Sequence, residues 1–417
     1  MIDAVFAEIR VDAIRRNLAA IRKRVGPKRA ICVAVKANAY GHGLQQVLPV
    51  LAHDGIEQVA VANLPEALQA RQLGWQRPIL CLGPLSAIRD ERVVREVVRE
   101  AIQGRVSFTI PSTDELLLIG AEALQLNRRA RVEIKVDTGM GRMGLLPQPA
   151  EEVVAEAIAH PGIILDGVYT HFASADESDL TFARQQLSEF VRWTERLRRN
   201  GLKLGTIHAA NSAATFRLPG SHLDKVRCGL AVYGYCDSLS ENRSTELAPT
   251  MRVVSRLTAV RKLPPGHAVG YGRTFTTQHE SLIGIVPIGY ADGYSRQLSN
   301  NAVMTLEPIR NQGCRTVPVV GRISMDQTTV DLSEAGDVRV GDPVTIIDDD
   351  PQAPHSVEAL ARQLETIPYE ITALVGERVR RVAIPELAQS TVQRKPVAPN
   401  PIYGTPLPIR STKNATS

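Results

Sequence analysis

Aromatic residues and cysteines are both scarce in this chain of 417 residues. Only 4% of the residues are aromatic, which disfavours a protein that stacks the bases of a nucleic acid on its surface. The five cysteines show no CxxC spacing, so we expect neither a disulfide framework nor a metal site. No apolar run approaches the length of about 18 residues that a transmembrane helix needs. The first residues, MIDAVFAEIRVDAIRRN, do not predict a signal peptide, so we expect a cytoplasmic protein without a membrane partner.

The length and the charge are those of an ordinary globular protein. At 417 residues the chain is long enough for two domains, each with its own core. The formal net charge of +5 is modest for this length. Basic clusters such as Arg22-Lys23-Arg24 fall within helical patterns among acidic and apolar residues, so they indicate solvated helix faces. We therefore expect no nucleic-acid partner.

One stretch near the N-terminus, ICVAVKANAYGHG, joins a buried strand to a possible reactive lysine. Its apolar, β-branched first part is typical of a strand in a parallel sheet, buried on both faces. Lys36 follows directly, and Gly41 and Gly43 permit a sharp turn before the next helical pattern. A lysine at the carboxyl end of such a strand either extends to solvent or lies in a ligand site. In a partly desolvated site its amine can form a Schiff base.

The first 240 residues alternate strand and helix patterns. Eight strands with intervening helices predict an α/β fold, an N-terminal (β/α)8 barrel of the TIM type over residues 1–240. The expected strands are Ile31–Val35, Gln58–Asn63, Pro78–Gly83, Arg105–Ile110, Arg131–Asp137, Ile164–His171, Thr206–Asn211 and Lys225–Tyr233.

The pattern changes after residue 240. Short alternating strands separated by turn signals predict a mainly-β C-terminal domain over residues 241–388. Its expected strands are Arg252–Val260, Ser281–Pro287, Ala302–Leu306 and Val344–Ile347, with one helix at Val357–Leu364. Residues 389–417 are polar and proline-rich, and we expect a disordered tail.

Polar residues follow or interrupt several of the barrel strands. Barrel enzymes place their chemistry at the carboxyl-terminal mouth, so several polar residues there indicate a site. Each alone is more often structural, because a lone strand histidine is usually a core group and an Asn-Ser pair usually caps a helix. The residues concerned are Lys36, Lys135, Arg142, His171, Asn211, Ser212 and Arg227.

Several motifs, in order along the chain, resemble those of alanine racemases. They include AVKANAYGHG around Lys36, KVDTGMGRMG from Lys135 and KVRCGLAVYG around Arg227. The resemblance extends roughly from Ala7 to Pro385. It implies an isomerase that interconverts L- and D-alanine with pyridoxal 5'-phosphate, supplying D-alanine for peptidoglycan. Ser212 at the start of a helix offers a hydroxyl and backbone N–H groups to a phosphate, and Gly229 in the last expected strand lets a phosphate approach the main chain.

The resemblance also implies the cofactor site. Lys36 would bind the cofactor, and Arg227 would face the nitrogen of its pyridine ring. A permanently charged arginine there disfavours protonation of the ring and restrains side reactions. The implied cofactor-binding residues are Lys36, Tyr40, His171, Asn211, Ser212, Arg227, Gly229, Leu230 and Tyr369.

Two catalytic bases and a shared active site are implied in the same way. Lys36 would serve one face of the substrate Cα, and Tyr271 from the partner subunit of a homodimer would serve the other. The lysine that Lys135 matches is often carbamylated in the family and positions the arginine that Arg142 matches, but the sequence alone admits an unmodified Lys135 equally. The implied substrate-binding residues are Arg142, Tyr290, Met325 and Asp326.

Other functions remain open at this point. A broader or serine-directed racemase shares the same motifs, and the sequence leaves the preferred small amino acid open. A decarboxylase of this fold is disfavoured, because Met325 precedes Asp326 where such enzymes typically have a cysteine, and Tyr271 is present. A non-catalytic protein that only binds pyridoxal phosphate is disfavoured by the large second domain.

Overall fold

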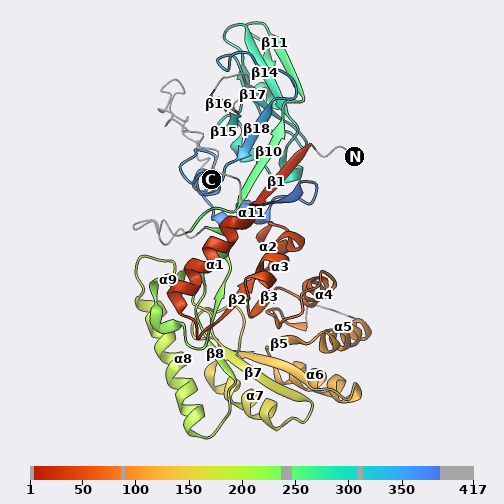
Figure 1. The fold of residues 1–417 in the computed structure, drawn as a ribbon, viewed down its shortest axis with the longest axis vertical. Coiled ribbons are helices and arrows are strands. Elements are labelled where there is room, and N and C mark those ends of the chain that lie inside the picture. Colours follow the sequence, from red (N-terminus) through yellow and green to blue (C-terminus); the bar gives the residue numbers. More distant parts are fainter. Residues whose placement is uncertain (1–3, 86–89, 236–246, 308–312, 386–417) are drawn as a thin grey trace, which may run out of the picture. The chain divides into compact units, whose positions relative to one another are not determined.

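A closed barrel of parallel strands forms the first part of the chain (Figure 1). The computed structural model describes residues 4–85, 90–235, 247–307 and 313–385. The prediction of an eight-stranded barrel is confirmed for these residues. The barrel strands are β2 (Ala30–Ala34), β3 (Gln58–Val61), β4 (Ile79–Cys81), β5 (Val106–Ile110), β6 (Ala130–Lys135), β7 (Ile163–Tyr169), β8 (Thr206–His208) and β9 (Lys225–Cys228).

Helices lie between successive barrel strands and cover the outside of the barrel (Figure 1). Their apolar faces pack on strands whose own side chains are almost all buried, as a parallel sheet requires. The helices are α1 (Val11–Val25), α3 (Leu44–His53), α4 (Leu64–Gln72), α5 (Glu91–Gln103), α6 (Thr113–Gln125), α7 (Pro147–Ala159), α8 (Thr181–Arg199) and α9 (Ser212–Arg217). The short segment α2 (Lys36–Tyr40) lies at the barrel mouth and turns left-handed.

The last barrel strand ends earlier than the sequence predicts. The expected strand Lys225–Tyr233 stops at Cys228, and the 3-10 helix η3 (Leu230–Tyr233) follows. These four residues are apolar and buried, so their composition resembles a strand although the backbone turns, with Val232 N donating to Gly229 O at 2.8 Å. Gly229 and Leu230 therefore lie beyond the strand, on the side of the barrel mouth.

The second domain is mainly β. One sheet has the order β16-β15-β18-β10-β1-β19, and a second has the order β11-β14-β17. The expected strand Arg252–Val260 is wrong, because the chain breaks at Leu257 into two strands of different sheets. The elements are β10 (Met251–Arg256), β11 (Ala259–Leu263), β12 (Ala268–Val269), β13 (Phe275–Thr276), β14 (Ser281–Val286), β15 (Val303–Leu306), β16 (Arg315–Pro318), β17 (Thr328–Asp331), β18 (Pro343–Ile347), β19 (Arg380–Ile384), α10 (Val357–Gln363) and α11 (Pro368–Ala373).

The first strand of the chain belongs to the sheet of the second domain. Strand β1 (Val5–Arg10) pairs antiparallel with β10 and parallel with β19, and Figure 1 shows it beside β10. Its alternating burial shows that one face packs into the core. The chain then enters the barrel through α1, so the two domains are joined by the chain at two places.

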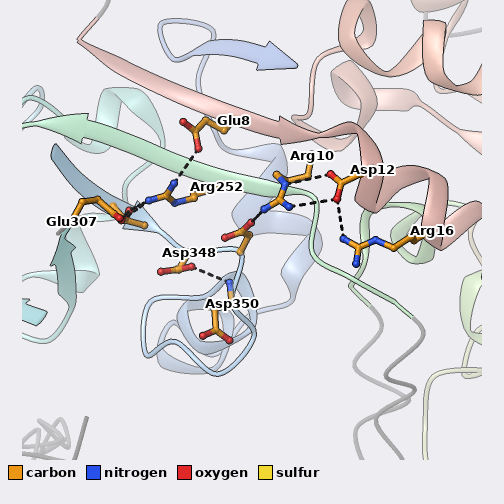
Figure 2. Close-up of polar contacts among 10 residues, drawn as sticks. Glu8, Arg10, Asp12, Arg16, Arg252, Glu307, Asp348 and Asp350 are labelled. Carbon is orange, nitrogen blue, oxygen red and sulfur yellow. Dashed lines mark hydrogen bonds and ion pairs between the residues drawn. The ribbon is translucent and has the colours of Figure 1, made fainter. Parts of the chain in front are cut away.

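Ion pairs hold the end of β1 to the neighbouring strands (Figure 2). Arg10, the last residue of β1, donates to Asp349 Oδ2 at 2.6 Å and pairs with Asp12 in α1. Arg252 on β10 pairs with Glu8 at 3.3 Å and also with Glu307. These part-buried pairs connect β1, β10 and the segments that follow β15 and β18.

None of the helices in the described part of the chain is long and apolar enough to cross a membrane. The expected disordered tail, residues 389–417, lies outside the described residues.

Candidate active site

Lys36 lies at the mouth of the barrel, two residues after the end of β2. Its side chain is half-buried, and its ammonium nitrogen lies 5.9 Å from the centre of the Tyr40 ring. Burial and the nearby charge of Arg142 lower the pKa of Lys36. Both effects favour the neutral amine, which is the nucleophilic form.

Tyr40 forms the centre of an aromatic cluster beside Lys36. Its ring lies 5.2 Å from that of Tyr233 and 5.7 Å from that of Tyr369, which comes from α11 of the second domain. A Cβ atom at Gly229 would lie 2.5 Å from the Tyr40 hydroxyl, so only glycine fits at that point. The structure thus brings together Lys36, Tyr40, Gly229 and Tyr369, which the motifs place far apart in the sequence.

Asn211 and Ser212 begin α9 at the same mouth. The Asn211 side chain caps the helix by accepting from Ala214 N at 3.0 Å. Ser212 Oγ accepts from Gly229 N at 3.0 Å and from Ala231 N at 3.3 Å. The hydroxyl is buried and joins the start of α9 to the turn after β9, where Gly229 and Leu230 lie. A hydroxyl and backbone N–H groups can donate to a phosphate, and small residues let the phosphate approach the main chain.

Arg227 is buried at the end of β9, and its guanidinium is held from several sides. It donates to Thr170 O at 2.6 Å and Ala209 O at 3.0 Å, and it contacts His171 Nδ1 at 3.2 Å and His208 Nδ1 at 2.6 Å. Because a guanidinium only donates, both histidine Nδ1 atoms accept. Burial and the charge of Arg227 hold the pKa of His171 well below its usual value, so this ring is neutral.

Lys135 and Arg142 lie on either side of a short loop after β6. The Asp137 carboxylate shapes this loop by accepting from the backbone N–H groups of Gly139, Met140 and Gly141, at 2.7 to 2.9 Å. Burial, together with the charges of Arg142 and Arg227, lowers the pKa of Lys135 to about 8. The mouth therefore holds four cationic side chains within electrostatic reach of one another, Lys36, Lys135, Arg142 and Arg227.

A buried chain of charges that the sequence does not predict lies below the mouth. Lys225 Nζ donates to Glu133 Oε1 at 2.9 Å, and His208 Nε2 donates to Glu133 Oε2 at 2.6 Å. Although burial alone raises the pKa of Glu133, Lys225 and His208 hold it far below its usual value. Burial and Lys225 lower the pKa of His208 to about 3, so the histidine is neutral and its Nδ1 is free to accept from Arg227.

The sequence signal of this chain of charges is weak: Glu133 and Lys225 lie in the strand segments VEIK and KVRC, where charged and apolar residues alternate. That signal marks residues that need a buried partner without showing which one.

The residues expected from the second domain lie mainly on its surface. Tyr271, in the 3-10 helix η5 (Tyr271–Arg273), is 70% exposed, and Tyr290 and Met325 are 43% and 53% exposed. Tyr290 N donates to Ser324 O at 3.1 Å, which brings the Tyr290 and Met325 segments together. Asp326 pairs with Arg378 at 2.8 Å. Within the described residues, no polar contact joins this group to Lys36 of the same chain.

Family models match the chain in two adjoining parts. The alanine racemase N-terminal domain matches residues 9–237, and the alanine racemase C-terminal domain matches residues 250–383. The chain belongs to the alanine racemase family. The resemblance that the motifs indicated is therefore confirmed, and the two matched domains correspond to the barrel and the mainly-β part.

Individual alanine racemases are similar over most of their length. The enzyme of Desulforamulus reducens is 39% identical over 388 residues, covering 92% of this chain and 100% of the relative. Alanine racemase 1 of Caldanaerobacter subterraneus is 36% identical and covers 90% of this chain and 93% of its own. The crystal structure of alanine racemase from Streptomyces lavendulae superimposes with a TM-score of 0.81 at 34% identity, covering 93% of this chain and 98% of that one.

Proposed function

We propose that this member of the family interconverts L- and D-alanine with pyridoxal 5'-phosphate bound at Lys36. The observation that carries the proposal is the half-buried Lys36, with its lowered pKa, beside the Tyr40 ring at the mouth that also holds the buried Arg227. An amine that is neutral more often than a free lysine is ready to bind an aldehyde. Barrel, second domain and motifs all agree with those of alanine racemases.

The residues at the mouth fit this cofactor. Its phosphate would be held by the hydroxyls of Tyr40, Ser212 and Tyr369, with Asn211, Gly229 and Leu230 forming the adjacent turns. The steric observation at Gly229 supports this, because a side chain there would collide with the Tyr40 hydroxyl. Once bound, the cofactor would supply an electron-withdrawing ring that makes the Cα proton of an amino acid acidic.

Arg227 would face the ring nitrogen of the cofactor. Its guanidinium cannot give up a proton at neutral pH, so it stabilises an unprotonated ring nitrogen. The carbonyl groups of Thr170 and Ala209, with the neutral rings of His171 and His208, fix the direction in which it donates. Arg227 in this position would keep the bound ring a weaker electron acceptor, which would favour return of the proton to Cα over side reactions.

Proton transfer at Cα needs one base on each face. Lys36 can take or return a proton on one face. For the other face we propose Tyr271 from a second copy of the chain, in a homodimer with shared sites. The exposure of Tyr271 and Met325, without contact to Lys36 in their own chain, supports their use by another copy.

The substrate carboxylate would be bound by Arg142, with Tyr290, Met325 and Asp326 of the second copy lining the same side. A carbamylated Lys135 would carry a negative charge and pair with Arg142. The lowered pKa of Lys135, about 8, supports this, because only the neutral amine reacts with carbon dioxide. We propose that the enzyme works in the cytoplasm and supplies D-alanine for the cell wall.

The test is chiral analysis of L-alanine and L-serine after incubation with purified protein and pyridoxal phosphate. We expect rapid formation of D-alanine and little D-serine. Equal formation of both products would replace the proposal with a broader racemase. If neither D-amino acid forms although the cofactor is reducibly attached to Lys36, racemisation is excluded and decarboxylation or cofactor storage takes its place.

A further inference from the structure

The segment between Lys36 and Gly41 has an unfavourable backbone conformation. Ala37, Asn38, Ala39 and Tyr40 have φ angles of 52°, 53°, 57° and 53°. These four residues form one turn of left-handed helix. Most residues other than glycine and asparagine avoid this conformation. Such a conformation persists only where its surroundings hold it. The turn places Tyr40 against Gly229 and Lys36 at the mouth, so its shape determines the geometry of the site.

His42 contacts this turn directly. Its Nδ1 lies 2.9 Å from the carbonyl oxygen of Tyr40 and 3.1 Å from that of Ala39. Both partners are acceptors, so Nδ1 must carry the proton and donate to both. The ring is completely buried, and its Nε2 has no hydrogen-bond partner among the described residues. His42 therefore donates from Nδ1 to two carbonyl groups of the turn, while its Nε2 has no partner among the described residues.

Other contacts fix the position of the His42 ring. The ring stacks on Tyr233, with centroids 4.4 Å apart and an angle of 23° between the planes. The Tyr233 hydroxyl donates to Ala34 O on β2 at 3.1 Å. Burial lowers the pKa of His42 to about 4, and Arg381 contributes to this lowering, so the ring is neutral near pH 7. Tyr233 also contacts Tyr40, so the same aromatic ring supports both residues.

We propose that His42 is a positioning residue, which holds the left-handed turn and thereby sets the Tyr40 hydroxyl for the phosphate of the cofactor. This inference rests on the proposed use of pyridoxal phosphate, and it assigns His42 no contact with the cofactor. It predicts that loss of the Nδ1 donor weakens recognition of the phosphate group more than recognition of the ring.

The experiment compares His42→Phe, which retains a stacking ring without a donor, with His42→Asn, whose side-chain amide donates from nearly the same position. His53→Phe on the exposed surface of α3 is the matched control. Dissociation constants of pyridoxal phosphate and of pyridoxal are measured by fluorescence on protein freed of cofactor. We expect His42→Phe to bind pyridoxal phosphate about tenfold more weakly, as for one lost hydrogen bond, with little change for pyridoxal. His42→Asn should recover most of the loss.

Amide hydrogen exchange supplies a readout that does not need the cofactor. Within the turn, Gly41 N donates to Ala37 O and Gly43 N donates to Asn38 O, both at 2.9 Å. In His42→Phe these two amides should exchange faster, while those of the barrel strands stay unchanged. Wild-type affinity and wild-type exchange in His42→Phe would overturn the inference. A wild-type protein that binds no pyridoxal phosphate would instead refute the proposed function, and unchanged exchange would then decide against His42 independently.

Discussion

Arg227 in the barrel and Tyr271 in the second domain illustrate two ways of holding a proposed functional group. Arg227 is buried and contacts two carbonyl groups and two histidine rings. Tyr271 is 70% exposed and lies between two glycines with positive φ, Gly270 and Gly272. A buried cation held by four hydrogen-bond partners is fixed before any ligand arrives, whereas an exposed tyrosine in a glycine-flanked turn needs another surface to fix it. The difference supports the proposal that one chain prepares the cofactor side of the site and leaves the second base to a partner subunit.

The largest effect is expected on the racemase activity, when the proposed second base is removed. Tyr271→Phe removes the proposed second base and retains the ring, so racemisation should fall by about 10²–10⁴-fold, the usual contribution of a general base. Cofactor binding should stay unchanged, because Tyr271 is not among the residues proposed to bind the cofactor. Racemase rates and the affinity for pyridoxal phosphate are measured on the same preparation. Wild-type racemisation in this variant would remove Tyr271 from the mechanism.

The buried charges below the mouth give the next largest effect. Glu133→Gln leaves Lys225 buried without its counter-charge, which should lower the free energy of unfolding by about 3–5 kcal/mol. Glu151→Gln breaks a more exposed pair with Arg196 and should cost about 1 kcal/mol or less. Denaturant unfolding of the two variants tests the contrast. Equal losses of unfolding free energy would show that the buried charges of Lys225, Glu133, His208 and Arg227 do not stabilise the barrel.

A smaller effect is expected where the Tyr40 hydroxyl meets the backbone. Gly229→Ala introduces a Cβ 2.5 Å from that hydroxyl, and the packed Tyr40 ring has little room to move. Overpacking of this kind costs about 1–3 kcal/mol, which should appear as weaker binding of pyridoxal phosphate. Gly220→Ala is the control, because its Cβ would meet only Leu187 Cδ2 at 3.9 Å. Identical affinities in both variants would contradict the proposed phosphate site.

The effect that is smallest near neutral pH is a dependence of stability on pH, which grows only as the pH falls. The pKa values of His208 and His42 are lowered from 6.5 to about 3 and about 4, so the folded barrel keeps both rings neutral. The unfolded chain binds protons first, so stability should be full above pH 6.5 and fall as the pH drops towards these values. Each ring contributes about 1.4 kcal/mol per pH unit within that range. Unfolding of cofactor-free protein at several pH values measures the slope, and His42→Asn should make it shallower.

The sequence predicted the barrel because most of its strands are predominantly apolar runs with a helical pattern after them. It predicted the last strand too long, because Leu230 to Tyr233 are apolar and buried whether the backbone extends or turns. Strands of two residues, such as β12 and β13, show no periodicity and were missed. The pairing of β1 with β10 spans more than 240 positions, and no local pattern indicates it.

The candidate site was predicted through its motifs, but its supporting contacts were not. The sequence around Glu133 does not show that Lys225 and His208 both bind its carboxylate. The three residues lie on three different strands, which meet only in the closed barrel. The left-handed turn was equally hidden, since alanines at residues 37 and 39 favour ordinary right-handed helix. Function was therefore easier to predict than the physical support of that function.

Mixing two inactive variants tests most directly whether each site is built from two chains. Lys36→Ala lacks the cofactor lysine, and Tyr271→Phe lacks the second base. After subunit exchange, half of the dimers are mixed, and one of the two sites in each has both groups intact. The account predicts recovery of about one quarter of the wild-type racemase activity. A mixture that stays as inactive as its components, although exchange is demonstrated with differently tagged chains, would contradict a shared site.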